Sequence, residues 1–162
     1  MKNDLIDVLF KKYYNEAVLY AMSLCRDEAL AEDIVSEAFF KALASADDSV
    51  RNFKPWLLAV CRNEFLMHCR KRSRISDEEI SEEMAVQEDE MLNQIIRKEE
   101  YRALYKAISI LPDSQKEPVI LFYFNGLSVK EIADVVGKSE ANIKVLLHRA
   151  REQLRKNMEG IR

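Results

Sequence analysis

The sequence predicts an all-α protein in which a flexible acidic linker joins two small helical domains. The chain has only three glycines and three prolines in 162 residues, which favours long helices over a turn-rich sheet protein. Apolar residues recur every three to four positions through most of the chain, as in helices with one buried face. The predicted domains are residues 1–74 and 95–162, and the predicted linker is residues 75–94.

The first domain is predicted to begin with two amphipathic helices. The first helix would run from about Asp4 to Leu24, and Asp27 could cap a second helix that runs to about Ala44. The inward positions of the first helix are Leu5, Val8, Leu9, Tyr13, Ala17, Tyr20 and Leu24. Those of the second helix are Ile34, Val35, Ala38, Phe39 and Leu43. Residues 45–52 have no apolar period and are predicted to form a loop.

A third helix is predicted from Pro55, which suits a first helical turn, to about Lys71. This segment is apolar almost all the way round, so we expect it to pack on more than one side. Trp56 and Phe65 are interpreted as core residues. Asn63 has two interpretations, either a buried amide that needs hydrogen-bond partners or an exposed amide that could read a base edge.

The second domain is predicted to begin with a helix from about Ile95 to Ile110, which Leu111-Pro112 ends. Another helix should cover Asp113 to Phe124, and Asn125-Gly126 should end it. The three cysteines are odd in number and lie within apolar patterns, which favours core thiols over disulfides: Cys25, Cys61 and Cys69.

The segment from Leu127 to Arg151 predicts two helices hinged by a glycine turn. Ser128 and Glu131 have the spacing of a capping box, Gly137 can supply a positive φ, and Ser139 can cap the second helix. The buried stripe of the second helix would be Ile143, Leu146, Leu147, Ala150 and Leu154. Its exposed side would carry Lys144, His148, Arg149, Arg151, Arg155 and Lys156. Such a helix-turn-helix can place side chains in a DNA major groove, although an ordinary helical hairpin with a solvated basic face has the same pattern.

Charge is segregated along the chain, although the net charge is only −3. Residues 51–74 have a local net charge of +6, residues 76–100 of −8 and residues 138–162 of +4. Because surface potential follows the local distribution of charge, two basic modules flanking an acidic connector remain compatible with nucleic-acid binding.

Several function classes are disfavoured by what the sequence lacks. No apolar run reaches the roughly 18 to 20 residues needed to span a bilayer, and the N-terminus has no secretory signal pattern, so we expect a cytoplasmic protein without membrane insertion. There is no glycine-rich phosphate loop, and His68 and His148 both lie in basic helices. The sequence therefore predicts a non-enzyme with no cofactor and no metal site.

Four segments together carry a family resemblance, namely residues 31–39, 56–72, 111–121 and 127–151. In this order and spacing they resemble the extracytoplasmic-function (ECF) sigma factors of bacterial RNA polymerase. The first segment is similar to the polymerase-clamp-binding helix of that family, and the second to the helix that reads the −10 element. The third is similar to the entry to the second conserved domain, and the fourth to the helix-turn-helix that reads the −35 element. The resemblance covers nearly the whole chain outside the linker.

The resemblance implies a non-catalytic subunit that directs the RNA polymerase core enzyme to specific promoters and helps to open the −10 region. Residues implied in binding the clamp helices of the β′ subunit are Asp33, Glu37, Phe40 and Lys41. Those implied in binding the −10 DNA are Asn52, Phe53, Arg62, Asn63, Arg70 and Arg72. The 45–52 loop and Asn63 would capture an unstacked base there. Those implied in binding the −35 DNA are Ser139, Asn142, Lys144, Val145, His148, Arg149, Arg151 and Arg155.

The same resemblance implies further partners, namely the β flap of RNA polymerase, promoter DNA and an anti-sigma factor, and a protein that is monomeric when free. Met67, Val145 and Leu146 depart from the family pattern, and the last two put in doubt any −35 sequence inferred from relatives. Two other readings stay open at this point. One is a free-standing transcription regulator whose first domain dimerises or senses a ligand, and the other is a helical interaction adaptor.

Overall fold

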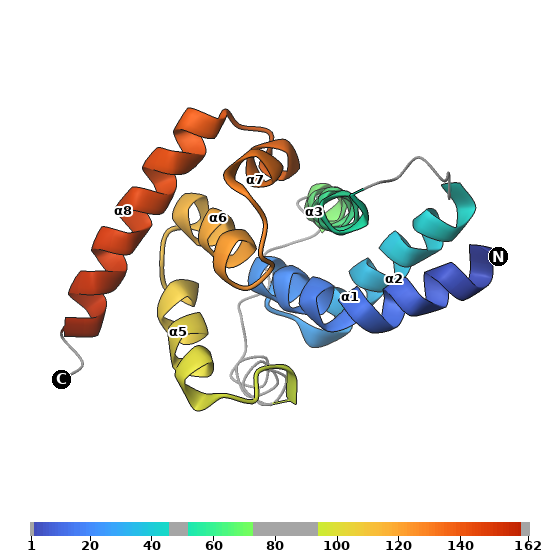
Figure 1. Cartoon of the computed structure of the whole chain (residues 1–162), viewed down its shortest axis with the longest axis horizontal. Coiled ribbons are helices and arrows are strands. Elements are labelled where there is room, and N and C mark those ends of the chain that lie inside the picture. Colours follow the sequence, from blue (N-terminus) through green and yellow to red (C-terminus); the bar gives the residue numbers. More distant parts are fainter. Residues whose placement is uncertain (1, 46–51, 73–93, 160–162) are drawn as a thin grey trace. The chain divides into compact units, whose positions relative to one another are not determined.

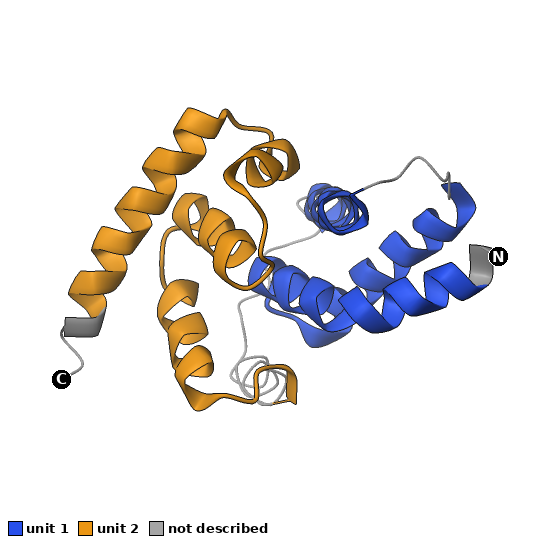
Figure 2. Cartoon of the chain, in the orientation of Figure 1, with its two compact units in different colours: residues 1–91 blue, residues 92–162 orange. Residues whose placement is uncertain are grey.

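The computed structural model describes residues 2–45, 52–72 and 94–159, and all regular secondary structure in these residues is helical (Figure 1). The chain divides into two compact units, residues 1–91 and residues 92–162 (Figure 2). The prediction of an all-α fold with two helical domains is confirmed. The predicted acidic linker and most of the predicted loop after the second helix lie outside the described residues.

The described part of unit 1 contains three helices that pack against one another, α1 (Lys2–Cys25), α2 (Glu28–Ser45) and α3 (Phe53–Arg72). The backbone N–H of Leu30 donates a hydrogen bond of 3.2 Å to Oδ1 of Asp27. This bond satisfies one of the free donors in the first turn of α2, so the predicted capping role of Asp27 is confirmed.

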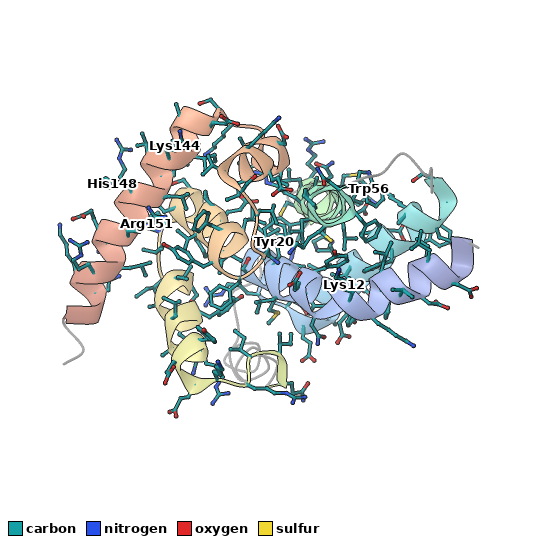
Figure 3. The ribbon with its side chains drawn as sticks, viewed as in Figure 1. Lys12, Tyr20, Trp56, Lys144, His148 and Arg151 are labelled. Carbon is teal, nitrogen blue, oxygen red and sulfur yellow. The ribbon has the colours of Figure 1, made fainter. Side chains whose placement is uncertain are left out.

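Small residues let α1 and α2 approach closely in the core of unit 1. Ala17 and Ala21 of α1 and Ala31 and Ala38 of α2 are fully buried. Tyr20 is also fully buried and adds a large side chain to this core (Figure 3). The core of unit 1 therefore combines small side chains with at least one large buried ring.

Three residues predicted to face the core are exposed instead, namely Leu5 at 56%, Val8 at 60% and Leu43 at 42%. In α2, Ala42 is buried in place of its neighbour Leu43. In α1, burial is complete only from Ala17 to Ser23. Helical periodicity gives the direction of a side chain but not the length over which a neighbouring element covers it, so these three predictions are wrong.

Aromatic contacts position the first turn of α3. The ring centroid of Phe53 lies 5.9 Å from the centroids of Tyr13 and Phe39, and 5.8 Å from that of Trp56. Phe53 thereby contacts both other helices of unit 1. Aromatic pairs at such separations contribute about 0.5–1.5 kcal/mol each beyond the area they bury.

The burial of α3 differs from the prediction. Its fully buried residues, Leu57, Leu58 and Cys61, lie on one face, whereas Trp56 and Phe65 are half-buried. Helix α3 packs against both α1 and α2, as expected of a helix that packs on more than one side, but Trp56 and Phe65 are not fully buried core residues. Apolar side chains such as Trp56 and Met67 therefore remain on the outward surface of α3, which is described with the functional site below.

The helix predicted from about Ile95 begins later than predicted. Helix α5 (Glu99–Ser109) starts four residues after Ile95, because Lys98 has an extended backbone with φ −79° and ψ 123°. Nη1 of Arg102 donates to the backbone oxygens of Ile96 and Arg97, both at 2.8 Å. These hydrogen bonds hold the non-helical segment that precedes α5.

Helix α6 (Asp113–Tyr123) follows Pro112 and ends just before Asn125-Gly126, close to the predicted end at Phe124. Gly126 has a φ of 67°, and the backbone N–H of Leu127 donates to the carbonyl oxygen of Leu121 at 3.0 Å. A positive φ costs glycine little, so this residue can end α6 and redirect the chain toward the next helix.

The predicted helix-turn-helix is formed by α7 (Val129–Val136) and α8 (Glu140–Glu159), and its local signals are confirmed. The backbone N–H of Ser128 donates to Glu131 Oε1 at 2.9 Å, and the backbone N–H of Glu131 donates to Ser128 Oγ at 3.1 Å, which completes a capping box. Gly137 ends α7 with a φ of 71°. The predicted buried stripe of α8 is buried throughout: Ile143, Leu146, Leu147, Ala150 and Leu154.

The three cysteines have three different environments. All are free thiols, as predicted, but only Cys61 is fully buried, Cys25 is half-buried and Cys69 is exposed, so the prediction of a core position is wrong for Cys69. Burial raises the pKa of the Cys61 thiol to about 12 and that of Cys25 to about 11. Because the thiolate is the nucleophile, both buried thiols should be unreactive at neutral pH.

We therefore expect one fast phase when the folded protein is labelled with a thiol reagent at pH 8, and this phase should come from Cys69. Cys61 should become reactive only after unfolding in denaturant, because burial raises its pKa to about 12. A chromogenic disulfide reagent measures the number of thiols and their rates. A fast phase that persists in the Cys69→Ser variant would contradict the assignment.

Candidate nucleic-acid interface

The outward face of α3 carries residues spaced seven apart, Trp56, Asn63 and Arg70. At about 100° per residue this spacing places the three on one face, opposite the side that carries Leu58 and Cys61. Asn63 and Arg70 are exposed, and Trp56 is half-buried. Of the two interpretations of Asn63, the structure therefore supports an exposed amide.

Trp56 was interpreted from the sequence as a core residue, but it belongs to this outward face. Its seven-residue separation from Asn63 was a signal that the two side chains share a direction, but the ring was interpreted as core. Met67 lies near the same face and is also exposed, at 41%. An apolar surface with an amide and a cation suits the faces of unstacked bases next to a phosphate chain.

The other residues predicted for the −10 DNA lie at separate places on unit 1. Asn52 is exposed immediately before α3, and Phe53 is half-buried in the aromatic cluster with Tyr13. Arg62 precedes Asn63 by one residue, so it points about 100° away from it, and it is half-buried. Arg72 is exposed at the end of α3. Only Asn63 and Arg70 of the predicted set therefore share the outward face.

The predicted polymerase-binding residues lie on the exposed side of α2. Asp33, Glu37 and Phe40 follow at intervals of four and three residues, which places them in one row. Phe40 is 64% exposed, which is unusual for so large an apolar ring. Lys41 is also exposed, but its ammonium group forms an ion pair with the carboxylate of Glu64 in α3. A row of two acids and one apolar ring is suited to a protein partner.

The exposed face of α8, opposite its buried stripe, carries two parallel rows of side chains. Lys144, His148 and Arg155 form one row, in which Lys144 and His148 lie along α8 in that order (Figure 3). Asn142 and Arg149 belong to the other row, together with Val145, which is 44% exposed. All of these side chains reach the surface because the stripe from Ile143 to Leu154 faces the unit's core.

Two residues predicted to contact −35 DNA also make contacts within unit 2. Nε of Arg151 donates to the Tyr123 hydroxyl at 2.8 Å, and its guanidinium carbon lies 5.6 Å from the ring centroid of Phe122. Arg151 is thereby held against α6. Oγ of Ser139 accepts a hydrogen bond of 3.1 Å from the backbone N–H of Asn142 and caps α8. Both residues shape the surface of the helix-turn-helix.

The described residues contain no group of three or more His, Cys, Asp or Glu side chains that could hold a metal ion. None of the described helices is long and apolar enough to cross a membrane. What the exposed surfaces of α3 and α8 offer is cations, amides and apolar rings. These groups can neutralise phosphates, donate hydrogen bonds to base edges and stack on bases.

Two family profiles match the chain, and they match one unit each. Residues 9–75 match the family described as Sigma-70 region 2, and residues 101–154 match the family described as Sigma-70, region 4. The class of protein is therefore a sigma factor with two conserved domains. The first match covers α2, α3 and all but the start of α1, and the second covers α7 and all but the end of α8.

Relatives similar over nearly the whole chain narrow this class. The chain is 35% identical over 156 residues to the ECF RNA polymerase sigma factor SigM of Bacillus subtilis strain 168, with 93% of each chain covered. It is 28% identical to the RNA polymerase sigma factor YlaC of the same strain, covering 96% of this chain and 92% of that one. The chain belongs to the ECF sigma factors of RNA polymerase.

Solved structures of sigma factors have a similar fold. The co-crystal structure of the sigma factor RpoE in complex with the anti-sigma factor NepR from Bartonella quintana is similar with a TM-score of 0.70 and 26% identity, and each chain is covered completely. The structure of CnrH in complex with the cytosolic domain of CnrY has a TM-score of 0.66 and 19% identity, covering 98% of this chain and 90% of that one. The latter likeness shows the fold alone.

The function that follows is promoter-specific transcription initiation by RNA polymerase. As a sigma factor the chain binds the polymerase core and promoter DNA, and it is not a catalyst. Family membership thus confirms the functional prediction made from the four segments. It also excludes the two other readings, the free-standing regulator and the interaction adaptor.

Proposed function

We propose that unit 1 docks on the clamp helices of the β′ subunit through α2 and captures an unstacked base of the −10 element on α3. Unit 2 reads the −35 element through α8 and contacts the β flap. The observation that carries this proposal is that two separately packed units each present an exposed helix face with cations and an amide. One face would serve single-stranded DNA and the other duplex DNA.

On α2, the docking row consists of Asp33, Glu37 and Phe40, and Lys41 lies at its edge. The exposed ring of Phe40 supports this role, because apolar rings at the centre of an interface supply a large share of its binding energy. The two acids give the row a charge that favours a basic partner surface. Electrostatic attraction of this kind raises the rate of association and fixes orientation.

On α3, Asn63 lies between Trp56 and Arg70 on the outward face. A flipped base leaves its stack at a cost of a few kcal/mol, which an amide contact and an apolar surface would offset. Arg70 and Arg72 lie toward the end of the helix, where they would neutralise phosphates of the same strand. Asn52 is the last residue of the predicted 45–52 loop and Phe53 follows it, and both would add to the surface that contacts the base.

On α8, Asn142, Lys144, Val145, His148 and Arg149 are proposed to face base edges. Arg149 can form two hydrogen bonds to a guanine, and Val145 can contact a thymine methyl group. Arg155 lies further along the helix and is proposed to contact phosphate. Ser139 and Arg151 hold the helix in position and add contacts to the DNA backbone.

We further propose that the free protein is a cytoplasmic monomer that an anti-sigma factor controls. The structural likeness to RpoE, whose structure was solved in complex with the anti-sigma factor NepR, supports this partner class. Two weak DNA contacts on one tether become effective only when polymerase holds both units at the promoter spacing. The DNA affinity of the free protein should therefore be low.

The Asn63→Ala variant tests this assignment. We expect it to bind core polymerase as the wild type does, because the Asn63 side chain is exposed and contributes little to the fold. We expect it to open promoters several-fold less, because the proposed contact to the unstacked base is lost. Pull-down with core polymerase measures the first quantity, and run-off transcription with permanganate footprinting measures the second. Equal loss of both would assign Asn63 to the fold. Failure of the wild-type chain to bind core polymerase would overturn the proposal as a whole.

A further inference from the structure

An ion pair joins the two helices of unit 1 that have different proposed partners. The Nζ of Lys41 in α2 donates to Oε1 of Glu64 in α3, although the residues are 23 apart in the sequence. The side chain of Glu64 is only 13% exposed, whereas that of Lys41 is 44% exposed. The hydrogen bond to Glu64 raises the pKa of Lys41, so the lysine stays charged throughout the physiological range.

Glu64 has an unusual position for an acid. It is the only acidic residue in α3, whose last turn is strongly basic, and it directly follows Asn63. Neighbouring residues of a helix point about 100° apart. Asn63 therefore points outward while Glu64 reaches Lys41 of α2. A carboxylate without this partner would repel the phosphates of a DNA strand bound along α3.

The pair also restrains how α3 can rotate about its own axis. The apolar contacts of Leu57, Leu58 and Cys61 hold α3 against the bundle, but apolar packing is not directional. A hydrogen-bonded ion pair is directional, and it is placed at the turn of α3 that carries Asn63. A small rotation of α3 would swing Asn63 away from the strand that it is proposed to contact.

We propose that Lys41 and Glu64 form a positioning pair that couples docking through α2 to promoter opening at α3. Lys41 acts within the chain, by orienting α3 and neutralising Glu64, and not as a direct contact to polymerase. Docking that orders α2 would thereby order the face that carries Asn63. This inference rests on the proposed assignment of α2 to polymerase and of α3 to −10 DNA.

Charge-exchange variants separate this role from two simpler ones. The variants are Lys41→Glu, Glu64→Lys and the double exchange, with Lys11→Glu in α1 as a control that makes the same charge change at an exposed position. Three quantities are measured for each: affinity for core polymerase, the fraction of open promoter at saturating holoenzyme, and thermal unfolding of the free protein. Saturation removes any effect of weaker core binding from the opening measurement.

We expect each single exchange to lower the equilibrium constant for promoter opening, obtained from the open fraction, about fivefold, which corresponds to the upper range for an exposed ion pair. The double exchange should restore opening to within about twofold of wild type, because the pair re-forms with reversed charges. Lys11→Glu should leave opening unchanged. Neither single exchange should lower core affinity by as much as it lowers opening.

Two results would overturn the inference. If Lys41→Glu weakens core binding and opening is normal at saturation, then Lys41 is a direct polymerase contact. If the double exchange opens promoters no better than the single variants, then the two residues do not act as a pair. In either case wild-type protein would still open promoters with core polymerase, so these failures are distinguishable from a failure of the proposed function.

Discussion

Replacing Tyr20 with alanine is expected to destabilise unit 1 by about 3–5 kcal/mol, the usual cost of removing a large aromatic side chain from a core. Tyr20 is fully buried in α1, so its removal would leave a cavity in the core of unit 1. Domains of this size have total stabilities of only several kcal/mol. Most of the variant's unit 1 should therefore be unfolded at physiological temperature. Urea denaturation followed by circular dichroism measures the change.

The two units give this prediction an internal control. Because unit 2 has its own core, the Tyr20→Ala variant should keep the unfolding transition of unit 2 while it loses promoter-specific transcription. The matched control is Val8→Ala in the same helix, since Val8 is 60% exposed and should change stability by less than about 0.5 kcal/mol. A loss below about 1 kcal/mol in Tyr20→Ala would show that its burial contributes little.

Replacing Arg149 with alanine is expected to weaken use of the −35 element by about 1–3 kcal/mol, or roughly 5- to 150-fold. Arg149 is exposed on α8, on the side opposite the buried Ile143 and Leu147, so the fold should be unaffected. The loss arises because a guanidinium can donate two hydrogen bonds to one guanine, and alanine can donate none. Run-off transcription from promoters altered at each −35 position measures the preference.

Arg155 provides a matched control for this experiment. It lies further along α8, where it is exposed and also pairs with Glu152 at 3.6 Å, and it is proposed to contact phosphate. Arg155→Ala should weaken binding to all sequences equally and lower the salt dependence, whereas Arg149→Ala should relax preference at one position. An unchanged promoter preference in Arg149→Ala would remove this residue from the set that reads bases.

The helix-turn-helix was predicted almost completely because its signals are local. The capping box joins Ser128 to Glu131, and Gly137 ends the helix that it starts. The buried stripe of α8 depends on spacings of three and four residues. The capping box and the glycine end each join residues within one or two helical turns of one another, and the spacing of the stripe repeats over the same range, so all three signals can be read from nearby residues.

Predictions failed where burial depends on the length of a neighbouring element. Leu5 and Val8 have the spacing of core residues, but α1 is buried on every side only from Ala17 to Ser23. Trp56 is a large aromatic residue of the kind usually found in a core, yet it lies half-buried on the outward face of α3. Periodicity defines a face of a helix, and only the packed partners determine how much of that face is covered.

The pattern of residues along this chain was sufficient to predict two helical domains, most helix ends, the surface of α8 and the sigma-factor family. The contacts between helices were not predictable from that pattern. Lys41 meets Glu64 across 23 residues of sequence, and Arg151 meets Tyr123 across 28. Capping and amphipathic spacing are encoded within a few turns, whereas such pairs exist only once packing has set the distance and rotation of whole helices.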